Sequence, residues 1–446
     1  MDDTKMMDRQ GDIAAAYADA LEFLASQTKF GINMGLQRIT RLLELMGEPH
    51  RQGVKYIHIG GTNGKGSVSA FVAAMLRAAG YRTAVFNSPH LHSYRERYVI
   101  DGEMISREEV VQRIGQLKPI LTQMQAEGAE QPTEFELSTA LALRYFTDQQ
   151  VDYAVIEVGM GGSIDSTNVI VPELSLITNV AIDHMDYLGS TVAEIAAVKA
   201  GIIKPGVPAL TAAHDEAALT EIRAAAQNCG SDLGEFGRDF DFRFVSADES
   251  GQSFDFIDLA SGEELCGLRI ALLGRHQLVN AALAVSAARR LGLPEETIRT
   301  GLAAARWPGR LEIVSEQPLI LLDGAHNVAG MQALAAALRE YWPGRGIVAV
   351  LGMLADKERE KALAELLPLL SQVIVTRVPS YRAGDWESLA GVCRDAGVPC
   401  RTVEDVDAAV AAGREAVQPG QMLLVSGSLY MLADARAFLL GVADDV

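Results

Sequence analysis

The pattern of hydrophobic and polar residues divides the first part of the chain into alternating strands and helices. Short apolar runs bounded by glycine, proline or polar residues are typical of buried strands, and apolar residues three or four apart indicate amphipathic helices. Runs of the first kind occupy residues 55–61, 81–89, 151–159 and 173–182. Helical patterns occupy residues 13–24, 66–80 and 132–146. This alternation predicts an α/β fold with a largely parallel sheet.

From residue 240 the pattern changes and then restarts. Residues 240–273 hold short alternating runs, which predict a small antiparallel element appended to the sheet. After one more helical segment a proline and a glycine interrupt the pattern, so we place a linker near residues 301–309. Beyond it, strands again alternate with helices, without a G-x-G-x-x-G fingerprint. We therefore predict two domains, residues 1–304 and 305–446.

Composition and charge narrow the class of protein. The chain has 446 residues, of which 49% are hydrophobic and 22% charged, so it can bury more than one core and is not of the disordered class. Its 39 basic and 58 acidic residues leave a net charge of −19, which argues against a nucleic-acid partner and against attraction to membranes. No apolar stretch reaches the roughly 18 residues of a membrane span, so we expect a cytoplasmic protein. The four cysteines form no C-x-x-C pair and are expected to be reduced.

A glycine-rich loop, GGTNGKGS, connects the first predicted strand to a helix at residues 60–67. In such a loop the backbone N–H groups and the helix N-terminus surround a phosphate, and the lysine neutralises charge on the outer phosphates. The loop departs from G-x-x-x-x-G-K-[ST], because Ile59 stands at the first glycine position and Gly66 at the hydroxyl position. The flanking strand and helix still favour nucleotide binding over a simple turn. The predicted phosphate-binding residues are Gly61, Thr62, Asn63, Gly64, Lys65, Gly66 and Ser67.

Polar side chains follow two of the predicted strands. Glu157 ends one of them, where a carboxylate can hold the Mg²⁺ that accompanies ATP. His184 follows the next strand and should lie beside Glu157 if the two strands are neighbours, although a lone histidine is more often structural than a Mg²⁺ ligand. Thr191 and Glu194 form a capping box that opens the helix of Lys199. Apolar neighbours of this lysine would favour its neutral amine.

The loop and six further segments resemble the folylpolyglutamate synthase and dihydrofolate synthase branch of the Mur ligase superfamily. Gly66 is the feature of the loop that is similar to this branch. The other matching segments are GLQRI (35–39), NSPHL (87–91), TEFELSTA (133–140), DHMDYLG (183–189), VKAGIIKPG (198–206) and DGAHN (323–327). Six ordered matches are hard to obtain by chance. The resemblance implies an N-terminal P-loop ATPase-like domain with a parallel sheet, and a C-terminal Rossmann-like α/β domain.

The same resemblance implies a metal site. Ser88 and Glu157 match ligands of a first Mg²⁺, although a serine before a proline is also a common start of a turn. His184 matches a ligand of a second Mg²⁺, and Lys199 matches a lysine that reacts with CO₂ to give a carbamate, which supplies oxygen ligands. The implied cofactors are thus ATP, two Mg²⁺ ions, a carbamylated lysine and K⁺. Lys65, Glu157, His184 and Lys199 form the implied catalytic set.

Further residues match a nucleotide site shared by both domains. Asn280 lies on one helical face with His276, and its carboxamide can both donate to and accept from an adenine edge, although a buried helix contact is the alternative. In the family this asparagine is joined by an arginine and an aspartate of the second domain, which correspond to Arg310 and Asp323. His326 lies close by in the same motif. ATP is therefore expected at the domain interface.

The substrate residues are carried over from the family alone. Gly35, Leu36, Phe135, Asp165 and Ser166 fall in segments that receive a folate or pteroate, and Arg382 and Ser428 fall in segments near the glutamate pocket. An arginine can hold a carboxylate through two hydrogen bonds, although a solvated arginine is the alternative for Arg382. The chain departs from the family pattern G-G-R-x-D-A-T-N, since Ser163 and Ser166 replace the arginine and alanine. The loss of a cation there bears on substrate preference.

The implied activity is an ATP-dependent ligation of L-glutamate to a folate carboxylate, and also to dihydropteroate, through an acyl phosphate. The implied partners are small molecules only, and members of the family are typically monomers. Two alternatives stay open at this point: a Mur ligase that acts on a UDP-muramoyl precursor, and a P-loop switch that binds nucleotide without joining substrates. Gly66 and the absence of an obvious uridine-binding domain before residue 30 disfavour the first. The second leaves Glu157, His184 and Lys199 without a purpose.

Overall fold

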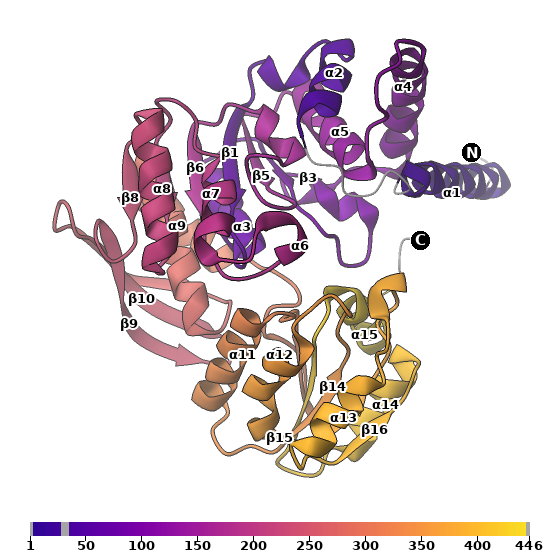
Figure 1. The fold of residues 1–446 in the computed structure, drawn as a ribbon, viewed down its shortest axis with the longest axis vertical. Coiled ribbons are helices and arrows are strands. Elements are labelled where there is room, and N and C mark those ends of the chain that lie inside the picture. Colours follow the sequence, from indigo (N-terminus) through magenta and orange to yellow (C-terminus); the bar gives the residue numbers. More distant parts are fainter. Residues whose placement is uncertain (1–2, 28–34, 443–446) are drawn as a thin grey trace.

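The computed structural model describes residues 3–27 and 35–442 and shows two α/β units, one above the other (Figure 1). The first unit ends with α10 (Glu295–Ala304), and the second begins with β12 (Glu312–Glu316). The α/β fold class that the sequence predicts is confirmed. The predicted linker begins a few residues too early, because positions 301–304 form the last turn of α10. The division at residue 304 stays a proposal, and it coincides with the end of this helix.

The first unit contains an eight-stranded sheet of order β4-β3-β2-β5-β1-β6-β7-β8. Its strands are parallel from β2 to β8, whereas β3 pairs antiparallel with β2 and β4 pairs antiparallel with β3. The strands are β1 (Lys55–Gly60), β2 (Thr83–Phe86), β3 (Tyr98–Ile100), β4 (Glu103–Met104), β5 (Tyr153–Glu157), β6 (Leu174–Ile177), β7 (Ala209–Thr211) and β8 (Leu233–Glu235). The condition set for His184 and Glu157, that β5 and β6 be neighbours, is not met, because β1 pairs with both. The glycine-rich loop after β1 therefore lies between the ends of β5 and β6.

Helices cover both faces of this sheet because alternate residues of each strand point to opposite sides. In β1, Ile57 and Ile59 pack in the core with α3, α9 and α10, whereas Tyr56 packs in the core with α1, α2, α4 and α5. A further core lies under α7 and α8. The helices are α1 (Asp3–Ser26), α2 (Gln37–Leu45), α3 (Lys65–Ala78), α4 (Arg107–Ala126), α5 (Glu134–Asp148), α6 (Met185–Leu188), α7 (Val192–Ala200), α8 (Glu216–Cys229) and α9 (Arg275–Arg290), with α10 as given above.

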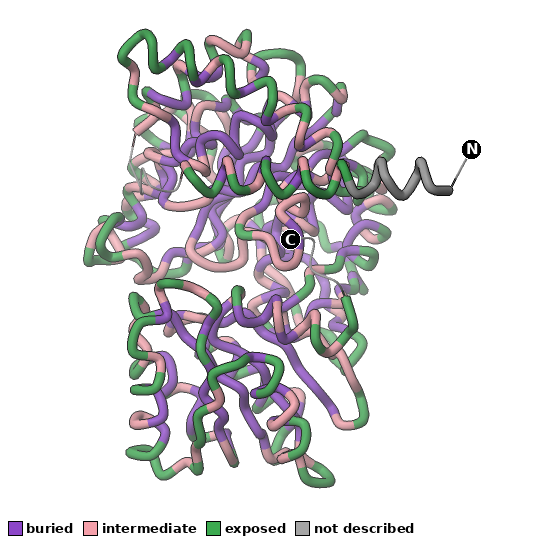
Figure 2. The backbone as a smooth tube through the Cα atoms, turned by 90° about the vertical axis from the view of Figure 1, so that its right-hand side faces the viewer, coloured by how far each residue is buried: buried purple, intermediate pink, exposed green. Residues whose placement is uncertain are grey.

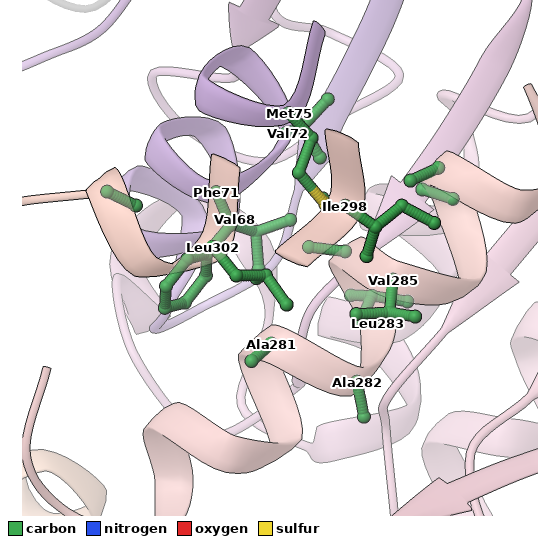
Figure 3. Packing of buried hydrophobic residues seen from close by; sticks show 14 of the residues in the cluster. Val68, Phe71, Val72, Met75, Ala281, Ala282, Leu283, Val285, Ile298 and Leu302 are labelled. Atoms are coloured by element: carbon green, nitrogen blue, oxygen red, sulfur yellow. The ribbon is translucent and has the colours of Figure 1, made fainter. Parts of the chain in front are cut away.

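The helix that follows the glycine-rich loop is held firmly by its neighbours. Val68, Phe71 and Met75 of α3 are fully buried against α9 and α10 (Figure 3). Gly301 of α10 lies so close that an added Cβ would be 2.4 Å from the Cα of Met75. Such close packing fixes the first turn of α3, and with it the loop, relative to the sheet.

The antiparallel element predicted at residues 240–273 is present as a three-stranded sheet of order β11-β10-β9. Its strands are β9 (Phe240–Asp248), β10 (Gly251–Asp258) and β11 (Glu264–Ile270). Phe254 and Phe256 of β10 are buried and belong to the same core as α3 and α9. The small sheet thus extends the first unit and carries the chain back to α9.

The second unit is a six-stranded sheet of order β12-β13-β17-β14-β15-β16, parallel except for β12. After β12 its strands are β13 (Leu319–Asp323), β14 (Ile347–Leu351), β15 (Leu370–Val375), β16 (Cys400–Thr402) and β17 (Met422–Ser426). Its helices are α11 (Val328–Tyr341), α12 (Arg359–Leu366), α13 (Ser388–Asp395), α14 (Val406–Ala416) and α15 (Leu429–Leu440). Alternate residues again supply two cores, one under α11, α12 and α13 and one under α14 and α15. This arrangement agrees with the predicted Rossmann-like domain.

The first helix is longer than its apolar pattern predicts. The pattern covers residues 13–24, whereas α1 spans Asp3–Ser26, because polar residues continue a helix without marking a buried face. Tyr17 and Leu24 are buried beside α4 and α5. In both units the buried residues lie inside and the exposed residues lie toward the rim (Figure 2). Within the described ranges, no helix is both long enough and apolar enough to span a bilayer. All four cysteines are free thiols.

Candidate active site

A cavity of about 640 Å³ lies between the two units, against the glycine-rich loop. Every residue that the sequence predicts to hold nucleotide or metal lines it. These are Gly61, Thr62, Asn63, Gly64, Lys65, Gly66, Ser67, Ser88, Glu157, His184, Lys199, Asn280, Arg310, Asp323 and His326. Residues more than 250 positions apart in the sequence thus meet in one space, and the second unit supplies part of its wall.

Backbone geometry and a network of hydrogen bonds shape the glycine-rich loop. Gly61 has φ 137°, and a Cβ there would lie 1.9 Å from Oγ1 of Thr178, so only glycine fits. The loop is tied to the segment after β6: the backbone N–H of Thr62 donates to the carbonyl of Asn179 at 2.8 Å, and that of Asn63 donates to Oδ1 of Asn179 at 2.7 Å. Oγ1 of Thr178 donates to the carbonyl of Asn63 at 2.6 Å. The loop is therefore held in shape by hydrogen bonds within the protein.

Two lysine amines share one acceptor in this loop. Nζ of Lys65 donates to the carbonyls of Gly61 and Thr62 at 3.3 and 3.2 Å, and Nζ of Lys199 donates to the carbonyl of Gly61 at 3.0 Å. Lys199 stands on α7 behind the predicted capping box of Thr191, which the structure contains. Burial, followed by the charge of Lys65, lowers the pKa of Lys199 to about 7. A large fraction of this amine is therefore neutral at physiological pH, as its apolar neighbours led us to expect.

Glu157 is a buried carboxylate at the end of β5. Its Oε1 lies 4.0 Å from Nζ of Lys65, and only 5% of the residue is exposed. Burial raises the pKa of Glu157 to about 7, although Lys65 and the backbone N–H of Ser88 oppose the shift. A carboxylate that is desolvated and only weakly paired is suited to a divalent cation, which would replace the missing countercharge. Glu157 with Ser88 therefore fits a Mg²⁺ site.

His184 lies across the loop from Glu157, at the start of the short helix α6. Its φ of 51° is a left-handed conformation, which is rare for a residue with a side chain and is often found at functional sites. Burial lowers its pKa to about 4, although neighbouring Asp183 opposes the shift. The imidazole is therefore neutral and able to act as a ligand at neutral pH. His184 and Glu157 line the same cavity although their strands are not neighbours.

Asp183 joins the two units. Its carboxylate accepts from Nζ of Lys357 at 2.6 Å and from Nδ2 of Asn327 at 3.2 Å, and both of these residues belong to the second unit. The side chains of Asp183 and Lys357 are 10% and 8% exposed, so the ion pair is buried. Burial alone would raise the pKa of Asp183, but Lys357 and His184 hold it well below its usual range. Sequence reasoning overlooked this pair, although Asp183 stands in the quoted segment DHMDYLG.

Asparagine side chains form a second contact between the units. Nδ2 of Asn327 donates to Oδ1 of Asn63 at 3.2 Å, and Nδ2 of Asn63 donates back to Oδ1 of Asn327 at 3.4 Å. Asn327 is also the N-cap of α11, where Oδ1 accepts from the backbone N–H of Gly330 at 2.8 Å. The phosphate loop of the first unit therefore touches the first turn of a helix in the second unit.

The second unit contributes three of the predicted nucleotide residues. Asp323 ends β13 and accepts from the backbone N–H groups of Leu311 and Ala325, both at 2.9 Å. Nδ1 of His326 donates to the carbonyl of Gly324 at 2.8 Å, which leaves Nε2 as an acceptor. Burial lowers the pKa of His326 to about 4, so the ring is neutral. Arg310 supplies a cation to this wall of the cavity.

Asn280 from the first unit faces the same cavity. Its Nδ2 donates to Oε1 of Gln277 at 3.0 Å on α9. A Cβ at Gly64 would lie 2.6 Å from Oδ1 of Asn280, so the amide packs directly on the loop. Asn280 is therefore placed to meet a ligand that the loop holds.

The residues predicted to bind folate or glutamate lie outside this cavity lining. The carboxylate of Asp165 accepts from the backbone N–H groups of Met160 and Thr167, both at 2.9 Å, and so organises its own turn. Oγ of Ser166 lies 2.7 Å from Oγ1 of Thr139. Gly35, Leu36 and Ser428 are at or next to helix N-caps, and Arg382 pairs with Asp356. The role of this set in binding stays a prediction.

Phe135 approaches the cavity from behind. A Cβ at Gly159 would lie 2.4 Å from Cζ of Phe135, and Gly159 is part of the cavity lining. The aromatic ring therefore supports the wall after β5. The buried ion pair between Arg38 and Glu136, at 3.0 Å, fixes the neighbouring segments TEFE and GLQRI to one another.

Comparison with known proteins agrees with this arrangement. The chain matches the Mur ligase middle domain over residues 59–288 and the Mur ligase glutamate ligase domain over residues 309–429. It is 36% identical over 432 residues to a Bacillus subtilis protein named dihydrofolate synthase/folylpolyglutamate synthase, covering 94% of this chain and 98% of that one. The chain belongs to the folylpolyglutamate synthase/dihydrofolate synthase family.

Two further members of the family are informative. The folylpolyglutamate synthase of Lacticaseibacillus casei is also 36% identical over 432 residues, covering 95% of this chain and 99% of that one. The Mycobacterium tuberculosis folylpolyglutamate synthase, solved in complexes with ADP and AMPPCP, superposes with a TM-score of 0.89 at 34% identity, covering 96% of this chain and 99% of that one. The family thus includes proteins named for one activity and for both. The resemblance seen in the sequence is confirmed.

Proposed function

We propose that this protein is an ATP-dependent ligase that joins L-glutamate to the terminal carboxylate of a reduced folate, and also to the benzoate carboxylate of dihydropteroate. One observation carries the proposal most directly. The phosphate loop, Glu157, Lys199 and the Asp323–His326 turn region, which come from both units, line one cavity. A nucleotide switch needs only the first unit, whereas a ligase needs a second domain to present the amine substrate.

The chemistry follows from the groups that line the cavity. A carboxylate becomes reactive toward an amine when the γ-phosphoryl group of ATP is transferred to it, which gives an acyl phosphate and ADP. Lys65 neutralises charge on the transferring group, and the loop N–H groups hold the phosphates. The amine of glutamate then attacks the acyl carbon, phosphate leaves, and the amine proton passes to solvent or to a nearby base. No covalent enzyme intermediate is needed, so positioning and exclusion of water account for catalysis.

The donor set fits two Mg²⁺ ions, which would neutralise phosphate charge when bound. Ser88 and the desolvated Glu157 would hold the first. His184 and a carbamate on Lys199 would hold the second. The carbamate forms when the neutral amine of Lys199 attacks CO₂ and loses one proton, and the pKa of about 7 supports this step because much of the amine is neutral. K⁺ is proposed only on the family resemblance.

We place the folate or pteroate near Phe135, Asp165 and Ser166, and the incoming glutamate near Arg382 and Ser428. The buried hydrogen bond between Ser166 and Thr139 supports a rigid wall there, since neither hydroxyl is left unpaired. Ser163 stands where relatives carry an arginine. The activity with dihydropteroate is therefore the finer part of the proposal, and it is tested separately. We also propose that the enzyme acts as a monomer in the cytoplasm.

The test is a ligation assay with purified protein, ATP, Mg²⁺ and labelled glutamate, and with tetrahydrofolate or dihydropteroate as the acceptor. Product mass and ADP are followed together. We expect glutamylated product with both acceptors, and none with the Lys65→Ala variant or without an acceptor. Product with tetrahydrofolate alone would reject the dihydropteroate activity. ADP release that needs neither acceptor nor glutamate would instead indicate a nucleotide switch, and product with a UDP-muramoyl acceptor would indicate a Mur ligase.

A further inference from the structure

The glycine at position 66 has a neighbour that explains it. Gly66 is the second residue of α3 and does not have a left-handed φ, so backbone freedom does not require glycine there. Space does. A Cβ on Gly66 would lie 2.5 Å from Cζ2, 2.7 Å from Cε2 and 2.9 Å from Nε1 of Trp307. The indole therefore occupies the place of the hydroxyl-bearing side chain that other phosphate loops carry at this position.

Trp307 belongs to the connection between the two units. On one side, the segment leaves α10, which is packed directly on α3. On the other side, the backbone N–H of Gly324 donates to the carbonyl of Gly309 at 2.9 Å, and that of Leu311 donates to Oδ2 of Asp323 at 2.9 Å. The same short segment thus touches the phosphate loop with an aromatic ring and is hydrogen-bonded to the nucleotide-facing turn of the second unit.

The ring is also accessible to whatever the loop binds. Trp307 is only partly buried, and it lines the cavity together with Asn280 and Arg310. The first turn of α3 is fixed by its neighbours, and no side chain at residue 66 separates it from the indole. A nucleotide that contacts the ring would therefore push it along the connecting segment toward the second unit rather than into α3, since close-packed groups yield little.

We propose that Trp307 is a positioning residue that couples occupancy of the phosphate loop to the placement of the second unit, and that Gly66 exists to admit its ring. The proposal rests on the proposed function in one respect only, which is that the loop binds ATP. It also explains why position 66 lacks the hydroxyl of other phosphate loops, because the indole that couples the two units takes the place of that side chain. It also predicts that the sizes of residues 66 and 307 are interdependent.

The first test is a double-mutant cycle on steady-state ligation. We expect Gly66→Ser to lower kcat sharply, because its side chain collides with the indole. We expect Trp307→Ala to lower kcat by about fivefold or more, the lower range of ordinary couplings between sites, with a smaller change in KM for ATP. Combining the two substitutions should restore activity above that of Gly66→Ser alone. Trp386→Ala, in the second unit away from the cavity lining, is the matched control and should leave kcat unchanged.

Two results would overturn the proposal. A double variant no better than Gly66→Ser would show that the two positions are independent. A higher KM for ATP with unchanged kcat in Trp307→Ala would show that the ring only lines the nucleotide pocket.

The second test does not depend on ligase activity. The chain has three tryptophans, so the double variant Trp342→Phe/Trp386→Phe leaves Trp307 as the sole indole. Addition of ATP and Mg²⁺ alone should shift its fluorescence, and glutamate alone should not. Calorimetry on the same protein establishes that the nucleotide binds. Binding without a fluorescence change would refute the coupling, whereas the absence of binding would refute the proposed nucleotide site itself.

Discussion

The buried ion pair between Asp183 and Lys357 makes a quantitative prediction about how the two units hold together. In Lys357→Met the substituted side chain keeps its length but loses its charge. Asp183 then stays between the two units beside the amide of Asn327, with Nε2 of His184 3.9 Å from its carboxylate. Removal of one member of a buried pair typically costs about 3–5 kcal/mol. We expect about 2–3 kcal/mol here, because Asp183 lines the cavity and water can reach part of it. Such a loss corresponds to a shift of about 1 M in the midpoint of urea unfolding.

A matched control lies four residues further along the chain. Lys361 pairs with Glu358, but its side chain is 74% exposed, and exposed pairs contribute little. Lys361→Met makes the same chemical change and should leave the urea midpoint almost unmoved. Both variants would be followed by circular dichroism at pH 7.5. Equal midpoints for the two variants would show that the ion pair between Asp183 and Lys357 does not stabilise the contact between the two units.

The same pair predicts the direction of a pH effect. In the folded protein the pKa of Asp183 lies below its ordinary value, so its contribution is complete at neutral pH and is lost only as pH falls below about 4, the unfolded value. In Lys357→Met, burial is no longer opposed by the lysine, and the pKa of Asp183 should rise. The difference in the free energy of unfolding between the unsubstituted protein and the variant should therefore become smaller as the pH falls from 7.5 to 5.5. A difference that grows on acidification would contradict this reasoning.

Further predictions concern the phosphate loop and its carboxylate. Glu157→Gln should raise the free energy of unfolding by about 2–3 kcal/mol at pH 8 and by little at pH 5, since a carboxylate with a raised pKa costs stability only where it is ionised. The variant should also lose its Mg²⁺-dependent activity. An unchanged free energy of unfolding in urea would contradict the raised pKa. Gly61→Ala should abolish ATP binding measured by calorimetry because of its contact with Thr178, whereas Gly80→Ala, at the far end of α3 with no atom within 4 Å, should cost stability but keep binding. Activity should rise as pH passes through about 7, where Lys199 loses its proton, and should respond to added bicarbonate; a flat profile down to pH 6 with no bicarbonate effect would contradict it.

The sequence predicts those parts of the molecule that local pattern determines. The strand, glycine loop and helix at residues 55–80 are a contiguous unit, so their residues could be assigned to one site. The positions of Glu157 and Lys199 followed from a buried strand end and a capping box. Where the prediction needed the order of strands, it could only be conditional, because nothing in the local pattern shows that β1 separates β5 from β6.

The contacts between the two units could not be predicted for the same reason. Asp183 and Lys357 are 174 positions apart, and neither stands in a pattern that points to the other. Trp307 was passed over because a tryptophan beside a proline and a glycine is typical of any linker. Its significance depends on the atoms that a side chain at Gly66 would meet, and these come together only in the folded chain.

The reciprocal amide contact between Asn63 and Asn327 has a consequence for the exchange of parts among relatives. Because the loop that receives phosphate is itself part of the contact between the two units, neither unit can be exchanged independently of the other. In a chimera that combines the first unit of one relative with the second unit of another, the two facing surfaces beside the phosphate loop would not match. Grafting should succeed only when the facing residues, Asn63 with Asn327 and Asp183 with Lys357, are exchanged as pairs.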